Sequence, residues 1–122
     1  VEATYSERDL ERGLTPAQIT RHFERRGEVY VIHEPVRRLV EFRRLNVIQP
    51  FVGLGEFDVI FCRNILIYFD EATRRRICGQ FATILRPGGW LILGAAENLY
   101  GISEQFESLR LGETFVYRKI TG

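Results

Sequence analysis

Residues 57–70 have the sequence FDVIFCRNILIYFD, and this stretch decides the fold. Its first six residues, 57–62, form a nearly continuous apolar run, which is typical of a strand covered on both faces of a sheet. Asp70 stands where a helix begins, and its short side chain can accept hydrogen bonds from the first free backbone amides. The stretch therefore predicts a buried strand followed by a capped helix.

The residues that follow extend this pattern into a βαβ unit. Pro87-Gly88-Gly89 is expected to end the helix, and residues 90–94 have the composition of a second buried strand. A strand, a helix and a strand in that order predict a parallel pair with a right-handed crossover. The expected core stripe of the helix has apolar side chains at helical spacing: Ile77, Phe81, Ile84 and Leu85.

The two ends of the chain carry weaker patterns. Residues 106–119 alternate apolar and polar side chains on either side of Gly112-Glu113, which predicts an antiparallel strand pair. Near the other end, Thr15 and Gln18 have the spacing of a capping box, so we expect a helix that ends at Gly27. Short strands are expected at residues 28–33 and 39–47.

Composition excludes several classes of protein. The 122 residues are 45% hydrophobic and 27% charged with a net charge of +1, values typical of a folded domain without general affinity for nucleic acid. Apolar runs are five residues or fewer, too short for insertion into a membrane. With two isolated cysteines and two isolated histidines, neither a disulfide framework nor a metal site is expected, and the cytoplasm is the expected location.

Polar residues follow the predicted strands where ligands bind to α/β sheets, beyond the carboxyl ends. Three such places are available: Asn46-Val47, residues 62–64 and residues 94–98. Asn64 and Asp70 can serve a ligand, or they can simply satisfy backbone groups at a turn from strand to helix. The pattern alone leaves both interpretations open. Gly53-Leu54-Gly55 precedes its strand, so it does not have the position of a phosphate-binding loop.

The run at residues 57–70 closely resembles the central motif of the CheR chemotaxis receptor methyltransferases. Further segments agree in the same order, at residues 12–16, 42–47, 85–89, 97–98 and 114–118. The resemblance implies a protein-glutamate O-methyltransferase that uses S-adenosyl-L-methionine on the cytoplasmic domain of chemoreceptors. Relatives usually carry His-Ser where this chain has Ala95-Ala96.

By position in the resembling family, Asn46 and Val47 would lie beside the adenine of the cofactor. Cys62 and Arg63 would flank its ribose and methionine parts, and Tyr68 would face the transferable methyl group as the catalytic residue. The family's fold implies an α/β class: a partial Rossmann-like class I methyltransferase sheet made of the later strands, with a small β-subdomain. The N-terminal half, with the cofactor loop, is expected to lie upstream of Val1, so the chain is expected to be a fragment that is weak or inactive alone.

The expected organisation is a lead-in at residues 1–12, a receptor-docking subdomain at 13–45 and the methyltransferase part at 46–122. Residues 21–44 hold seven arginines and four glutamates, which is either a solvated face or a docking surface that includes Arg37 and Arg38. A docking module without chemistry is therefore the alternative function, and a small-molecule methyltransferase is a third. The strand at 57–62 is expected to have an open edge through which two copies can pair.

Overall fold

A computed structural model describes residues 3–120 of the chain. The chain divides into two compact units between Arg44 and Leu45, and each unit is described by itself. Residues Thr4–Ser6, in the expected lead-in, pair with Val29–Val31 in the sheet of the first unit. No helix within residues 3–120 has the length and apolar character needed to cross a bilayer.

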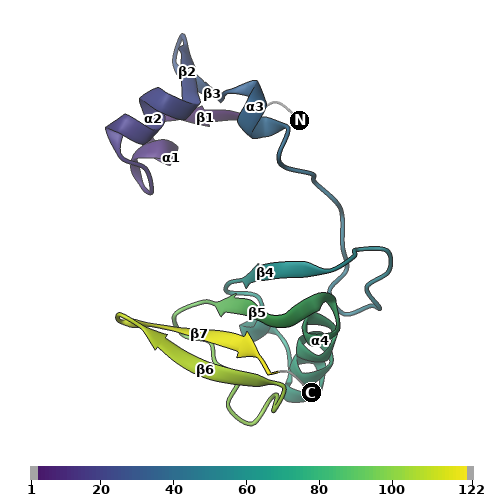
Figure 1. Cartoon of the computed structure of the whole chain (residues 1–122). Coiled ribbons are helices and arrows are strands. Elements are labelled where there is room, and N and C mark those ends of the chain that lie inside the picture. The colour runs from purple at the N-terminus through teal and green to yellow at the C-terminus, as the bar shows by residue number, and fades with distance from the viewer. Residues whose placement is uncertain (1–2, 121–122) are drawn as a thin grey trace. The chain divides into compact units, whose positions relative to one another are not determined.

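The first unit is a small antiparallel sheet with three short helices (Figure 1). Its strands lie in the order β1-β3-β2. The elements along the chain are β1 (Thr4–Ser6), α1 (Glu7–Glu11), α2 (Pro16–His22), β2 (Phe23–Arg26), β3 (Val29–Ile32) and α3 (Glu34–Arg37).

Local sequence explains where the helices of this unit begin. The Thr15 hydroxyl accepts from the Gln18 amide at 3.2 Å, and the Gln18 side chain accepts from the Thr15 amide at 2.9 Å. This reciprocal pair is the predicted capping box. Ser6 and Asp9 form a second one at the start of α1.

The helix expected to reach Gly27 ends earlier, at His22. Phe23 begins β2, and Arg26 pairs with Val29, so Gly27 lies in a two-residue hairpin turn. Its φ of 64° is the left-handed conformation that such a turn requires and that glycine adopts without strain. The helix prediction beyond His22 was wrong because pairing with β3 outweighs the local helical pattern.

The strand expected at residues 39–47 is also absent from the described chain. Leu39 and Phe42 are 84% and 75% exposed, and residues 40–46 form no regular element. An extended segment becomes a strand only when a neighbour pairs with its backbone, and no described strand does so here.

The second unit contains a four-stranded mixed sheet in the order β4-β5-β7-β6. The pair β4-β5 is parallel, and β5-β7 and β6-β7 are antiparallel, which confirms the predicted βαβ unit and the C-terminal strand pair. The elements are β4 (Phe57–Cys62), a 3₁₀ turn η1 (Leu66–Tyr68), α4 (Glu71–Ile84), β5 (Leu85–Leu93), β6 (Phe106–Leu111) and β7 (Thr114–Lys119).

In this unit α4 lies against the sheet (Figure 1), and buried side chains of both form most of the core. Asp70 caps α4 as predicted, accepting from the Thr73 amide at 2.8 Å. Ile77, Phe81 and Leu85 are buried, as expected for core positions. Leu85, however, lies in β5 and not in the helix, because α4 ends at Ile84. The strand runs through Pro87-Gly88-Gly89, which was expected to end the helix.

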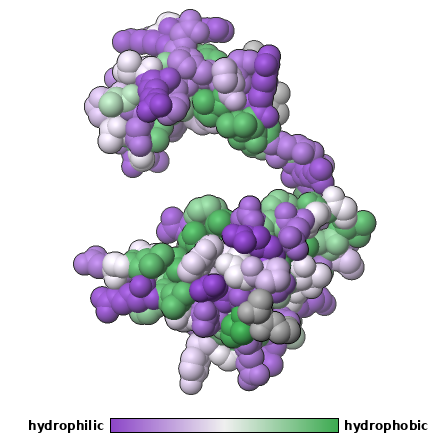
Figure 2. Space-filling view, viewed as in Figure 1, coloured by the Kyte–Doolittle hydropathy of each residue, from purple (hydrophilic) through white to green (hydrophobic). Residues whose placement is uncertain are grey.

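The other face of β4 is open, although its apolar run is typical of a strand that is covered on both faces. Phe57, Val59 and Phe61 are 39%, 40% and 71% exposed, since α4 covers one face of the sheet only. Within the described residues β4 pairs with β5 alone, so the expected open edge is present. Figure 2 shows hydrophobic atoms at the surface of this unit, in keeping with these exposed side chains.

Candidate functional site at the carboxyl ends of two parallel strands

The carboxyl ends of β4 and β5 lie side by side because the two strands are parallel and Cys62 is in register with Leu93. A left-handed residue follows β4 closely, and a turn in which the Glu97 amide donates to the Gly94 carbonyl at 3.0 Å follows β5. Asn64 has a φ of 60°, a left-handed conformation that asparagine tolerates better than most residues, and Gly94 directly follows β5. The chain therefore turns sharply at both strand ends, where α/β sheets bind ligands.

The side chain of Glu97 joins the two turns. Its Oε1 accepts hydrogen bonds from the backbone amides of Asn64 at 2.6 Å and Gly94 at 2.8 Å. Its Oε2 accepts from the amide of Ile67 at 3.2 Å. A carboxylate that is buried as Glu97 is must be well hydrogen-bonded, and these amides meet that need.

The protonation state of Glu97 follows from the same contacts. Burial alone would raise its pKa, because it disfavours the charged form. Hydrogen bonds from backbone amides, among them those of Asn64, Gly94 and Ile67, outweigh the effect of burial and hold the pKa of Glu97 below its ordinary value. At neutral pH the residue is a carboxylate, which accepts hydrogen bonds with both oxygens.

A glycine at position 94 is required by the close approach of these groups. A Cβ there would lie 2.8 Å from Glu97 Oε1 and 3.1 Å from the Asn64 amide nitrogen, and it would overlap Asn64 Oδ1. Gly94 thus allows the two strand ends to meet around one carboxylate.

Arg63 borders a hollow of about 520 Å³ at these strand ends. The rest of the lining comes from the end of β5 and the loop after it (residues 92–98), from residues 113–115 and from Tyr117 on β7. Tyr68 ends η1 with a 79% exposed side chain and does not line this hollow. The structure therefore brings Arg63 to the hollow. Tyr68, five residues further along the chain, projects into solvent.

Asn46 and Val47 lie in a loop that α4 holds in place. The Gln80 side chain accepts from the Phe51 amide at 2.6 Å and donates to the carbonyls of Gln49 at 3.0 Å and Val47 at 3.4 Å. Asn46 Oδ1 accepts from the Ile48 amide, so its amide nitrogen is the group left to meet a ligand. Neither residue lines the hollow beside Arg63.

Cys62 ends β4 with its thiol in the core, 3% exposed. Burial, followed by the nearby charge of Glu97, raises the pKa of Cys62 to about 11, so the thiol is neutral at physiological pH. A ligand beside Cys62 would meet its backbone instead of its sulfur.

Arg37 and Arg38 belong to the first unit, on α3. Both form ion pairs with Glu34, at 3.9 Å and 3.3 Å, so part of their charge is balanced locally. Side chains of this kind on a solvent-exposed helix contribute little to stability and remain accessible to a partner.

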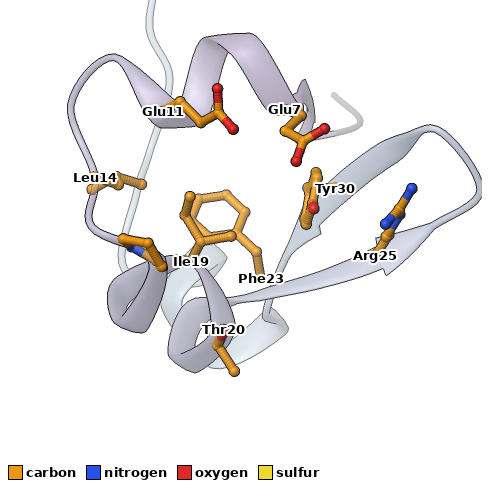
Figure 3. A pocket seen from close by; sticks show the side chains of 9 residues that line it. Glu7, Glu11, Leu14, Ile19, Thr20, Phe23, Arg25 and Tyr30 are labelled. Atoms are coloured by element: carbon orange, nitrogen blue, oxygen red, sulfur yellow. The ribbon is translucent and has the colours of Figure 1, made fainter.

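The first unit has a hollow of its own, of about 660 Å³ (Figure 3). Ile19 and Phe23 point into it, with Glu7 and Glu11 on the opposite side. None of the predicted site residues lines it.

Sequence reasoning missed Glu97 and Gln80 as residues that organise this region. Glu97 stood in a segment that follows a buried strand, but its charge does not reveal amide partners about thirty positions earlier in the chain. The one signal in the sequence was a glycine directly after a predicted strand, followed three positions later by a glutamate. Gln80 lies on α4 between buried positions and gave no signal.

The second unit is thus a mixed α/β domain whose polar loops follow the carboxyl ends of a parallel strand pair, the place where α/β sheets bind ligands. Residues 1–115 match the family model described as CheR methyltransferase, SAM binding domain. The chain belongs to the CheR methyltransferase family, whose cofactor is S-adenosylmethionine.

Several relatives share this similarity. A chemotaxis protein methyltransferase of Vibrio anguillarum is 41% identical over 115 residues, which cover 93% of this chain and 42% of that protein. Chemotaxis protein methyltransferase 1 of Pseudomonas aeruginosa is 37% identical over 88% of this chain and 39% of its own length. A probable biofilm formation methyltransferase of the same organism is 37% identical over 81% of this chain and 24% of its own. The chain thus spans about two fifths of the length of the first relatives it matches.

Proposed function

We propose that this chain forms the later part of a cytoplasmic methyltransferase that transfers a methyl group from S-adenosylmethionine to glutamate side chains on the cytoplasmic domain of chemoreceptors. Membership of the CheR family and the names of its relatives support the reaction class and the receptor substrate. The structural observation that carries the proposal is the loop at 63–68, which Glu97 holds at the carboxyl end of β4 and which bears Arg63 and Tyr68.

The described residues fit part of the cofactor. Arg63 is a cation at the edge of a hollow of about 520 Å³ and suits the carboxylate of the methionine part. The amide nitrogen of Asn46 suits an acceptor nitrogen of adenine, with Val47 beside the ring and the Cys62 backbone near the ribose. Because these groups would supply only part of the contacts that the cofactor needs, we expect the 122 residues alone to bind it weakly.

The proposed reaction needs no catalytic base from this chain. The bound cofactor supplies a methyl group on a sulfonium, which is already activated for transfer. A free glutamate has a pKa of about 4.3, so the acceptor is a carboxylate at neutral pH. What remains for the protein is orientation. Tyr68 is the residue we assign to aligning the methyl group, and its exposure leaves it accessible to a receptor side chain.

Methyl transfer by a chimera tests this function. In the chimera, this chain replaces the matched 115-residue segment of the Vibrio anguillarum relative. We expect incorporation of labelled methyl groups into a receptor cytoplasmic fragment, and release of the label as methanol in alkali, because carboxyl methyl esters hydrolyse there. A receptor fragment with its acceptor glutamates replaced by glutamine is the control. Alkali-stable label, or no label above that control, would contradict the proposal.

The first unit is proposed to dock on the receptor through α3. Arg37 and Arg38 are solvent-accessible cations suited to an acidic surface, although Glu34 balances part of their charge. Charge reversal of both residues should weaken capture of the receptor fragment, whereas Arg21→Glu, an exposed arginine on α2 of the same unit, should not. Equal capture by all variants would remove this docking role.

The open edge of β4 supports a further proposal, that two copies of this chain pair edge to edge. An edge strand with exposed Val59 and Phe61 and free backbone groups is a template for another strand. Light scattering should then give a mass above that of one chain, and Val59→Lys should restore the single-chain mass. A monomer at high concentration would rule this out.

A further inference from the structure

One buried carboxylate connects the loop that bears the proposed site residues to the neighbouring strand. Glu97 reaches back about thirty positions in the chain to the amides of Asn64 and Ile67, while the Gly94 amide holds the same carboxylate from its own loop. Asn64 is the left-handed residue that follows Arg63, and Ile67 is the middle residue of η1, which ends at Tyr68. Both ends of the turn between Arg63 and Tyr68 are therefore fixed to Glu97.

We propose that Glu97 is a positioning residue for methyl transfer, holding the segment from Arg63 to Tyr68 in register with the carboxyl end of β5. The part of this inference that concerns Tyr68 rests on the proposed function. The hydrogen bonds of Glu97 go to backbone amides, so the side chain acts on the path of the loop and leaves both site side chains free.

The two oxygens of the carboxylate have different partners, and this makes the role testable. Oε1 accepts from both Asn64 and Gly94 at short distances, whereas Oε2 accepts from Ile67 at 3.2 Å. Glutamine has the same shape but only one oxygen. In Glu97→Gln that oxygen should keep the two short contacts, and the NH₂ group should then face the Ile67 amide, donor against donor. The substitution should release η1 and leave the meeting of the two strand ends intact.

Amide hydrogen exchange of this chain, resolved by residue, tests the contact itself. Glu97→Gln should speed the exchange of the Ile67 amide roughly tenfold or more, and change the Asn64 and Gly94 amides much less. Glu104→Gln, at an exposed glutamate a few residues further on, is the matched control and should change none of them. An unchanged Ile67 amide, or an equal acceleration of all amides including the core of β5, would overturn the positioning role.

A double-mutant cycle in the chimera tests whether Glu97 acts through Tyr68. Glu97→Gln should lower kcat with little change in the KM for the cofactor, and Glu104→Gln should leave both unchanged. If the effect passes through Tyr68, the variant with both Glu97→Gln and Tyr68→Phe should be no slower than Tyr68→Phe alone. Losses that multiply would overturn the inference. An inactive unsubstituted chimera would instead contradict the proposed function, and the exchange experiment would then decide the positioning role by itself.

Discussion

Gly94 packs against Asn64 so closely that no side chain fits between them. A Cβ at position 94 would overlap Asn64 Oδ1 and lie 3.1 Å from the Asn64 amide nitrogen. We therefore expect Gly94→Ala to destabilise the protein by about 1–3 kcal/mol, because the two strand ends must separate. Urea unfolding monitored by circular dichroism measures this change.

Gly79 on α4 is the matched control for Gly94. An added Cβ at Gly79 meets nothing within 4 Å, and the residue lies inside a helix. Gly79→Ala should leave stability unchanged or raise it by about 0.5–1 kcal/mol. If the two substitutions had the same effect, the close approach at Gly94 would not limit that position.

Glu97 makes the free energy of unfolding depend on pH in the acid range. Its pKa is held below the ordinary value of 4.5, so the folded state binds the proton less readily than the unfolded state. This contribution is complete above pH 4.5 and is lost as the pH falls through the folded pKa. Unfolding free energies measured from neutral pH down to about pH 3 should fall more steeply for the natural protein than for Glu97→Gln. Identical slopes would argue against a charged, amide-bound carboxylate.

Cys62 and Cys78 are expected to resist alkylation in the folded protein. Burial is the main reason that their pKa values rise to about 11 and about 12, and neither thiol is accessible. Iodoacetamide at neutral pH should label both only in urea, as intact mass will show. Because unfolded thiols ionise near the ordinary value of 9.0, folding stability should also fall as the pH rises above that value. Labelling of Cys62 without denaturant would show that the strand end opens.

Tyr68→Phe should separate activity from stability. The side chain is 79% exposed, so its hydroxyl contributes little to folding, and the unfolding free energy should stay within about 0.5 kcal/mol of the natural value. In the chimera, methyl transfer should drop roughly tenfold to a hundredfold, since alignment of the methyl group is the proposed role. Full activity of the variant would remove Tyr68 from the site.

The features that the sequence predicted correctly depend on neighbours a few positions away. The capping box of Thr15 and Gln18 and the cap at Asp70 are local, and the turn at Gly112-Glu113 follows from alternation on both sides. The end of α2 and the expected strand at 39–47 depend on distant pairing partners. Phe23 pairs with Ile32 on β3, whereas residues 39–47 pair with no strand among the described residues.

The sequence predicted where the candidate site lies in the fold, but it did not predict the side-chain contacts that hold the site together. Parallel strands put Arg63 and Gly94 at the same edge by topology, which the motif pattern indicated. The tie from Glu97 to Asn64 and Ile67 depends on a side-chain direction that no spacing rule encodes. By contrast, the ion pairs of Arg37 and Arg38 with Glu34 have the spacing of three and four residues that makes side chains neighbours on a helix.

Gln80 has a consequence that extends beyond its own loop. Its amide group fastens residues 47–51 to the middle of α4, and the same helix fills the core with Ile77 and Phe81. Any rotation of α4 about its axis would shift the backbone next to Asn46 by a comparable amount. If Asn46 meets the adenine ring as proposed, substitutions deep in the hydrophobic interior should weaken the affinity for a ring that they never touch.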